Sequence, residues 1–275
     1  MVTLGLDLAA QDLKTGLCRV RWHDDGAEVE LACRSAGDEP ILAAARAAVA
    51  DGGAVGVDAP FGWPVDFATA VSSWAGGGAW PFERPAERVT VREHSALLRL
   101  RMTDRFAIET TRARGRARHP LSVSTDKIGI CAMRAAALLT AAGAPSRVDG
   151  PWFEVYPAAA RDLWALPTEN DKRDRDLRER RLRALVDGVE RAGAALTFRD
   201  DTRAACVDSD DVLDALLCAF VARAAALRGT LPPPDAAHAK AAEREGWIHL
   251  PSGGLDDLFT GRQSRRPAGS PGWAG

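Results

Sequence analysis

Residues 2–35 read VTLGLDLAAQDLKTGLCRVRWHDDGAEVELACRS, and this stretch decides the fold class. Its segments at 2–9, 15–23 and 27–35 are either apolar throughout or alternate between apolar and polar residues, which is typical of β-strands. The Asp-Asp-Gly turn at 24–26 separates the second segment from the third and is a strong hairpin signal. The sequence therefore predicts three strands at the start of the chain.

The segments that follow extend this sheet. Residues 39–50 (EPILAAARAAVA) are rich in alanine and have a proline in the expected first turn, which predicts a helix. AVGVDAP at 54–60 is a short buried-type strand that ends at proline, and WFEVYP at 152–157 predicts a further strand. Three strands, a helix and a returning strand predict an α/β domain with a mixed sheet and a crossover helix.

The rest of the chain is predicted to be mainly helical. Residues 61–150 are expected to form an insertion of loops and helices between the core strands. The 208–229 helix has the clearest pattern, with Asp208 or Ser209 as its N-cap. We expect a single domain over residues 1–261 and a disordered tail, rich in Arg, Ser, Pro and Gly, over residues 262–275. The remaining helices are predicted at 92–106, 125–143 and 171–191.

Length and composition exclude several classes of protein. With 275 residues and 46% hydrophobic side chains, the chain has enough apolar surface to fold. No apolar run approaches the roughly 20 residues of a membrane helix, and MVTLGLDLAA lacks the basic region and cleavage site of a signal peptide. We therefore predict a cytoplasmic protein without a membrane partner. Five scattered cysteines and five scattered histidines predict neither a disulfide framework nor a zinc site.

Acidic residues stand where the burial of a charge is costly. Asp7 lies in the apolar segment GLDLA and Asp58 in GVDAP, while Asp211 and Asp214 lie three residues apart on one helix face. Gathered together, carboxylates repel one another unless a divalent cation neutralises them, and Mg²⁺ prefers oxygen ligands. The four residues are therefore candidate metal ligands for attack by water on a phosphodiester. The alternatives are structural, because acidic residues also stabilise helix starts and turn caps.

Six short motifs occur along the chain in an order that is similar to one known family. The resemblance, which covers about residues 2–251, is to the DUF429 proteins, a family of predicted nucleases with the ribonuclease H-like fold. The motifs are GLDLA (5–9), VDAPFGWP (57–64), RMTD (101–104), FEVYPAAA (153–160), DSDDVLDALLCAFVA (208–222) and EGWIHLP (245–251).

The resemblance implies a ribonuclease H-like mixed sheet of five strands flanked by helices, with an insertion after the fourth strand. In Holliday-junction resolvases of this fold, acidic residues on the first and fourth strands meet two acidic residues on the last helix. Asp7, Asp58 and the pair Asp211 and Asp214 match these positions, although Asp58 stands where Glu is usual. The implied activity is that of a metal-dependent nuclease or phosphodiesterase. Its cofactor would be Mg²⁺ or Mn²⁺, and its substrate nucleic acid or a nucleotide-like phosphoester.

Four further polar residues each have two interpretations. Glu154 in FEVYP is either an additional catalytic carboxylate or the partner of a cation from the insertion. Arg101, oriented by Asp104, either clamps a substrate phosphate or pins the insertion to the core. Lys127, at the start of the predicted 125–143 helix, has the same two roles open to it.

The strongest basic segment is a run of arginines in the loop predicted at 111–120. The chain as a whole has a formal net charge of −2 and a pI of about 6.2, so any contact with nucleic acid depends on such a local patch. We predict that the run guides phosphates toward the acidic centre, the alternative being a loop that only faces solvent. The arginines are Arg112, Arg114, Arg116 and Arg118.

Two other classes of function compete with the nuclease. The first is a non-catalytic ribonuclease H-like module that binds nucleic acid or a nucleotide and whose acidic centre is only structural. The second is a nucleotide-dependent phosphotransferase, because actin-like kinases also open with a G-x-D strand. The second is disfavoured by residues 9–16, which read AAQDLKTG and lack a glycine-rich phosphate hairpin.

Overall fold

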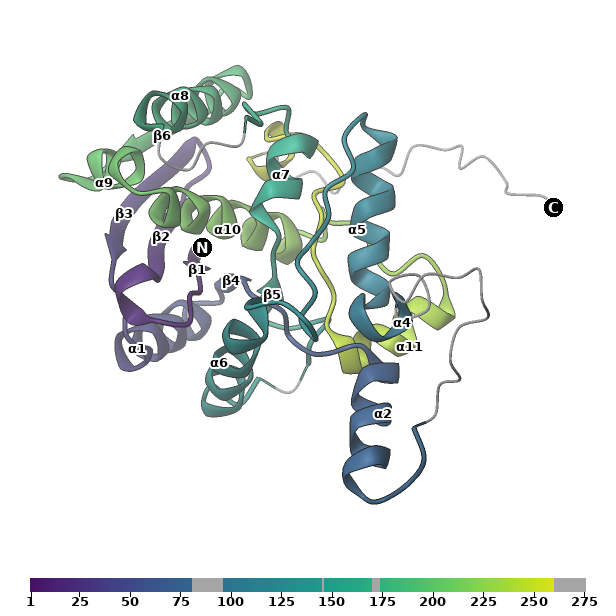
Figure 1. Cartoon of the computed structure of the whole chain (residues 1–275). Coiled ribbons are helices and arrows are strands. Elements are labelled where there is room, and N and C mark those ends of the chain that lie inside the picture. Colours follow the sequence, from purple (N-terminus) through teal and green to yellow (C-terminus); the bar gives the residue numbers. More distant parts are fainter. Residues whose placement is uncertain (81–95, 145, 170–173, 260–275) are drawn as a thin grey trace.

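The computed structural model describes residues 1–80, 96–144, 146–169 and 174–259 (Figure 1). The predicted tail at 262–275 and the start of the predicted 92–106 helix lie outside the described residues. The described chain forms one mixed β-sheet with helices on both faces. The predicted α/β class is therefore confirmed.

Within the described residues the sheet has six strands, namely β1 (Val2–Asp7), β2 (Gly16–Trp22), β3 (Gly26–Arg34), β4 (Ala54–Asp58), β5 (Trp152–Glu154) and β6 (Ala195–Phe198). They are arranged in the order β5-β4-β1-β2-β3-β6. The first three strands form antiparallel pairs, as the turn at 24–26 predicts. β4 is parallel to β1, β5 is parallel to β4, and β6 is parallel to β3.

The predicted count of five strands is wrong by one, because β6 adds an edge strand beside β3. β6 has only four residues, ALTF, and of these only Leu196 is buried. A segment this short contains one alternation of exposed and buried positions, which is too little to distinguish a strand from a turn. Its position depends on pairing with β3, where Leu196 lies opposite Ala27.

Helices cover both faces of the sheet (Figure 1). Every helix in the described ranges is too short or too polar to cross a membrane. The predicted 125–143 and 171–191 helices are found as α6 and α8, slightly shortened. The helices are α1 (Asp38–Ala50), α2 (Val65–Ala75), α4 (Ala96–Arg99), α5 (Met102–Ala113), α6 (Ile128–Ala141), α7 (Pro157–Leu163), α8 (Arg175–Arg191), α9 (Thr202–Asp208), α10 (Asp210–Ala226) and α11 (Ala236–Glu245).

Two hydrophobic cores lie on opposite sides of the sheet. α10, α8 and α9 enclose one of them, and α10 runs directly across β2, β1 and β4. α1 and α6 enclose the other, which receives Leu4 and Leu6 from β1. Because side chains alternate along a strand, Thr3, Gly5 and Asp7 face α10 instead. The sheet therefore presents Asp7 to the same side as α10.

α10 begins where the sequence predicts. Ser209 is its N-cap, and the Ser209 hydroxyl accepts a hydrogen bond from the Val212 backbone N–H at 3.4 Å. The helix packs unusually close to the sheet because glycines stand beneath it. A Cβ atom added at Gly5 would lie 1.8 Å from the carbonyl oxygen of Ala215, and one at Gly56 would lie 2.2 Å from that of Cys218. These two glycines therefore set the distance between α10 and the acidic strand ends.

Gly5→Ala is expected to lower the free energy of unfolding by about 3 kcal/mol, at the upper end for overpacking. The reason is that the new methyl group meets backbone atoms, which cannot rotate away. Urea unfolding measures the change. Gly76→Ala is the control, since Gly76 ends α2 at a φ of −82° and has nothing closer than 3.3 Å to an added Cβ. A Gly5→Ala variant with the unfolding midpoint of the wild type would contradict the close packing of α10.

Candidate functional site

Two of the predicted carboxylates lie side by side. Asp7 ends β1, Asp58 ends β4, and the two residues are direct partners in the parallel register. Partners on adjacent strands point to the same face and lie about 4.8 Å apart along the sheet. Both residues are half-buried and both face α10, because Gly5 and Gly56 of the same strands contact that helix. The strand ends thus place a pair of negative charges under α10.

Asp214 of α10 is the third carboxylate at this place. Cys218, a free and fully buried thiol, lies one helical turn after Asp214 on α10. Burial raises the pKa of Cys218, and the negative charges of Asp58, Asp7 and Asp214 raise it further. Asp214 also lines the same cavity as Asp58, so the two carboxylates lie at the same place.

Both helical carboxylates have arginine partners. Asp214 is buried and forms an ion pair with Arg161 of α7. Asp211, in the first turn of α10, lies over β2 and accepts from Arg34 Nε at 2.8 Å. The four predicted ligands do not form one preassembled metal group: among the residues that the structure describes, no three His, Cys, Asp or Glu side chains are placed to hold a metal ion. The described arrangement is a carboxylate pair, Asp7 and Asp58, with Asp214 held nearby by an arginine.

A cavity of about 290 Å³ opens beside this carboxylate pair. Asp58, Asp214 and Arg161 line it together with Tyr156, which follows β5. Burial raises the pKa of Tyr156 to about 12, and the charge of Asp58 adds to the rise. The phenol therefore keeps its proton at neutral pH and serves as a hydrogen-bond donor. The buried residues Arg101 and Glu154 also line it, together with His119. The remaining lining residues are apolar, namely Ala59, Pro60, Pro120, Leu121, Ile128, Val155, Ala158 and Ile248.

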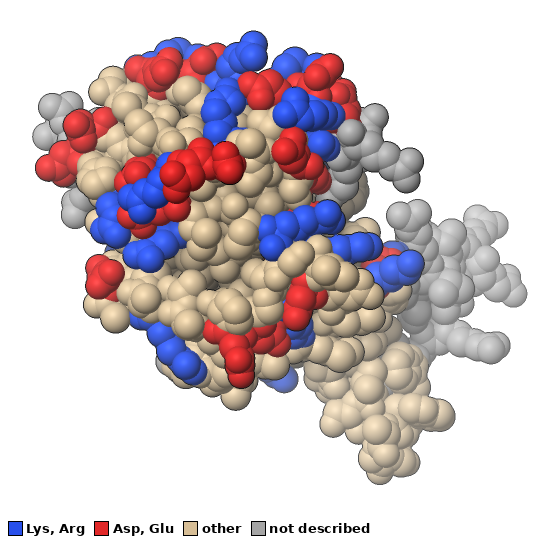
Figure 2. Space-filling model, turned by 90° about the vertical axis from the view of Figure 1, so that its left-hand side faces the viewer, with Lys and Arg blue, Asp and Glu red and all other residues tan. Residues whose placement is uncertain are grey.

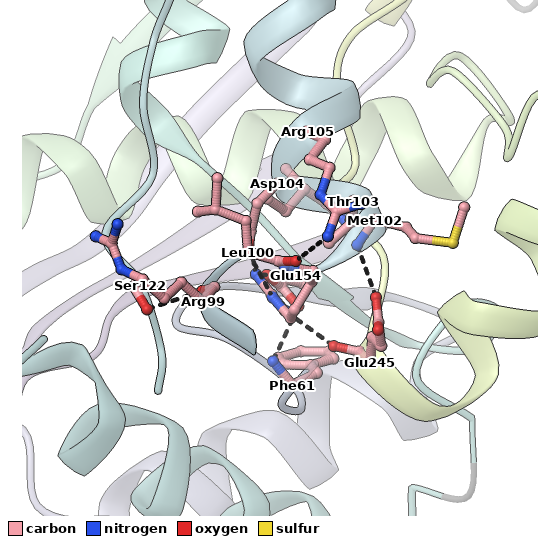
Figure 3. Close-up of polar contacts among 12 residues, drawn as sticks. Phe61, Arg99, Leu100, Met102, Thr103, Asp104, Arg105, Ser122, Glu154 and Glu245 are labelled. Carbon is pink, nitrogen blue, oxygen red and sulfur yellow. Dashed lines mark hydrogen bonds and ion pairs between the residues drawn. The ribbon is translucent and has the colours of Figure 1, made fainter. Parts of the chain in front are cut away.

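Glu154 lines the same cavity as Asp58, but its side chain starts from the opposite face of the sheet. It ends β5 and pairs in register with Val57, so it points away from the face that carries Asp58. Its carboxylate forms an ion pair with Arg101 at 2.6 Å and accepts from the Phe61 N–H at 2.9 Å (Figure 3). Glu154 and Arg101 are each only 2% exposed. The structure thus places Glu154 in the arrangement of its structural alternative, as the partner of a cation from the insertion.

Arg101 is saturated by acceptors from three parts of the chain. Its guanidinium donates to both oxygens of Asp104, to both oxygens of Glu154, and to the backbone oxygen of Glu245. An arginine has five N–H donors, and all five are used here. Burial opposes the charge of Arg101, but Asp104 and Glu154 outweigh this and raise its pKa. Arg101 therefore joins α5, β5 and α11 and keeps no donor for a phosphate.

The predicted basic residues lie at the edge of the cavity or in solvent. Arg112, Arg114 and Arg116 are exposed at the end of α5 and just after it, and Arg116 donates to the Thr168 carbonyl at 3.0 Å. The chain then continues through His119, Pro120 and Leu121, which line the cavity. On the face shown in Figure 2, side chains of both signs are intermixed over the visible described residues.

Two cations flank this segment in different ways. Arg118 forms an ion pair with Asp162 of α7 at 2.5 Å. Lys127 is exposed directly before α6, next to the cavity-lining Ile128. Arg118 therefore ties the segment to α7, whereas Lys127 faces solvent at the edge of the cavity.

Arg161 and Tyr156 are cavity residues that sequence reasoning does not single out. Both directly flank the motif segment PAAA at 157–160, and their only local signal is that they follow the buried strand β5. α7 has seven residues and no strong amphipathic pattern, so its inner face is not visible in the sequence.

Comparison with known proteins places the chain in a family. The family model described as "Protein of unknown function (DUF429)" matches residues 5–239. No curated protein and no solved structure matches the chain.

Proposed function

This chain belongs to the DUF429 family, and we propose that it is a metal-dependent phosphodiesterase with a ribonuclease H-like fold. The strand order supports this fold. Five strands, β5-β4-β1-β2-β3, form a mixed sheet with an antiparallel β1-β2-β3 unit and two parallel returning strands, and β6 adds one further edge strand. The crossovers place the acidic ends of β1 and β4 next to each other.

The observation that carries the proposal is the in-register pair of Asp7 and Asp58 beside the cavity. Mg²⁺ is usually bound through one or two carboxylates and completes its shell with waters and substrate phosphates. A pair of carboxylates, of which Asp58 lines the cavity, therefore fits this ion, whereas a complete protein cage is not required. Asp7 and Asp58 would hold Mg²⁺ or Mn²⁺, and Asp214 is the candidate for a third oxygen ligand.

The side chains around the pair have distinct tasks in the proposed reaction. When bound, a divalent ion supplies a water of lowered pKa and polarises the phosphoryl oxygen. Tyr156 donates its retained proton in a hydrogen bond to a substrate oxygen. The apolar wall around Leu121 and Ile128 limits water in the cavity, which strengthens the electrostatic interactions inside it.

Calorimetric titration with Mn²⁺ tests the metal site independently of activity. The wild type is expected to bind Mn²⁺ at millimolar concentration or below, and Asp58→Asn to bind it at least about tenfold more weakly. Asp187→Asn, which changes an exposed carboxylate on α8, is the control and should bind like the wild type. Equal affinity of Asp58→Asn and the wild type would contradict the proposed metal site.

The competing function is a non-catalytic module that binds a nucleotide or nucleic acid. The ion pair between Asp214 and Arg161 favours it, because a carboxylate that neutralises an arginine has a structural role without any metal. The two functions differ in their metal dependence. A wild-type protein that gives no heat with Mg²⁺ or Mn²⁺ but still binds nucleotides would establish the binding module and reject the phosphodiesterase.

A further inference from the structure

Arg161 is the one buried arginine of the cavity wall with an unused donor in the described part of the chain. Its side chain is 9% exposed, and its Nη1 forms the ion pair with Asp214. Its Nε is buried and has no hydrogen-bond partner among the described residues. A buried N–H without an acceptor is costly, so such a donor is expected to have a partner in the functional state.

Other buried arginines in the described residues donate to several protein acceptors. Arg101 uses all five donors on protein acceptors. Arg181 donates to Asp210 and to the carbonyl oxygens of Pro167 and Glu169. The donors of Arg161 are left incomplete at a cavity wall, where an incoming ligand can supply the acceptor.

The charges around Arg161 favour an anion as that ligand. Burial lowers the pKa of Arg181, and the positive charge of Arg161 lowers it further, which shows that the two guanidiniums repel each other. Tyr156 adds a neutral O–H donor to the same cavity. Arg161 and the Tyr156 phenol therefore form a donor set for phosphate oxygens in this cavity, and arginine binds phosphate in a two-pronged geometry.

We propose that Arg161 is the phosphate-binding residue of this cavity and that its ion pair with Asp214 is the resting arrangement, which substrate phosphate replaces. The phosphate oxygens take the place of the Asp214 carboxylate on the guanidinium. Asp214 is thereby released on the side of Asp7 and Asp58. The role of the released Asp214 rests on the proposed phosphodiesterase, whereas phosphate binding by Arg161 does not.

The size of the cavity defines the substrate class. At about 290 Å³ it is at the lower end of small-ligand sites, and its apolar lining offers contact to a sugar or base next to the phosphate. A specific duplex interface would bury roughly 1,000 Å² or more of protein surface. We therefore expect the cavity to bind one phosphorylated nucleotide unit. This unit is either a free nucleotide or the phosphorylated end of a strand.

Calorimetry in the presence of EDTA tests this assignment without any metal. The probes are inorganic phosphate, adenosine 5′-monophosphate, and a short single strand with or without a 5′-phosphate. Arg161→Gln is expected to weaken binding of the monophosphate by about 10- to 100-fold, the range for a lost charged hydrogen bond. Arg161→Lys keeps the positive charge but loses the two-pronged geometry of the guanidinium. Its affinity for the monophosphate should therefore lie between those of the wild type and Arg161→Gln. The matched control is Arg178→Gln, since Arg178 is as buried as Arg161, at 7% exposure, but donates to backbone oxygens of α9.

The direction in which Asp214→Asn changes the affinity for the monophosphate shows whether phosphate can replace Asp214 on Arg161. Asp214→Asn frees Arg161 and is expected to strengthen monophosphate binding several-fold, and this gain should vanish in the double variant with Arg161→Gln. Unchanged affinity of Arg161→Gln, or a gain from Asp214→Asn that persists without Arg161, would overturn the proposal. Circular dichroism checks that each variant folds. If Arg161→Gln does not fold, the monophosphate affinities of Arg161→Lys and Asp214→Asn test the proposal instead.

The strand probes identify the source of the phosphate. Binding that requires a 5′-phosphate assigns a strand end, whereas binding of the monophosphate alone assigns a free nucleotide. Equal binding of phosphorylated and unphosphorylated strands would overturn the terminal-phosphate assignment. A wild-type protein that binds no phosphate in EDTA but cleaves phosphodiesters with Mn²⁺ would reject Arg161 as the phosphate-binding residue. The proposed phosphodiesterase would then still hold.

Discussion

Asp7→Asn is expected to reduce Mn²⁺-dependent phosphodiester cleavage by about 10³-fold or more, which corresponds to roughly 4 kcal/mol of lost transition-state stabilisation. Asp7 is one of the two carboxylates that meet at the ends of adjacent parallel strands. Asparagine keeps the shape of the side chain but removes the charge that a divalent ion requires.

The measurement is the initial rate of cleavage of a labelled oligonucleotide and of a small aryl phosphodiester, with Mn²⁺ varied from zero to saturation. Asp187→Asn, on the exposed surface of α8, should keep the wild-type rate. A thermal melt of each variant separates lost chemistry from lost folding. Cleavage by Asp7→Asn at the wild-type rate would refute the assignment of the strand-end pair as the metal site.

Arg101→Gln is expected to lower the free energy of unfolding by about 3–5 kcal/mol, the usual cost of removing one partner from a buried ion pair. The substitution leaves the carboxylates of Asp104 and Glu154 buried without their cation. It also removes the hydrogen bonds that join α5 to β5 and α11. Chemical unfolding followed by circular dichroism gives the change.

The control for this variant is Arg199→Gln. Arg199 is 48% exposed and forms a two-pronged pair with Glu28, with distances of 3.0 and 2.9 Å. An exposed pair contributes about 0–1 kcal/mol, so this control should change stability little. Similar losses in the two variants would show that burial does not set the energy of the Arg101 cluster.

The stability of Arg101→Gln should also depend on pH in a defined direction. Burial raises the pKa of Glu154 in the wild type, and Arg101 offsets part of that rise. Without Arg101 the pKa rises further, so folding takes up a proton. A carboxyl whose pKa is higher in the folded state contributes most stability below its unfolded pKa of about 4.3 and loses it as pH rises through the folded pKa. The difference in free energy of unfolding between the wild type and Arg101→Gln should therefore become smaller as pH falls from neutral toward about 4.3.

Much of the sheet could be predicted from local sequence because strands and turns have local signals. The alternation in residues 16–34 and the turn at 24–26 correctly predict the β2–β3 hairpin. The cap at Ser209 and the apolar run after it correctly predict α10. β6 could not be predicted, because a four-residue strand gains its stability from pairing with β3 and not from its own pattern.

The candidate site was only partly visible in the sequence. Asp7 and Asp58 stand out because each is a charge at the end of an apolar strand, and the crossover makes those strands neighbours. Glu154 looks the same in the sequence, yet its partner in the register is Val57, which turns its side chain to the opposite face. A difference of one residue in register decides which face a carboxylate occupies, and a single strand carries no information about it.

The sequence by itself determined the α/β class, the hairpin, the long helices and the two acidic strand ends. All of these depend on the periodicity and capping of neighbouring residues. Only the tertiary structure decided what each charge meets: Arg101 binds Glu154, and Arg161 binds Asp214, in both cases across 53 residues of sequence. The physical reason is that the energy of a buried charge depends on the acceptors around it. Those acceptors come from distant segments that become neighbours only when the chain is folded.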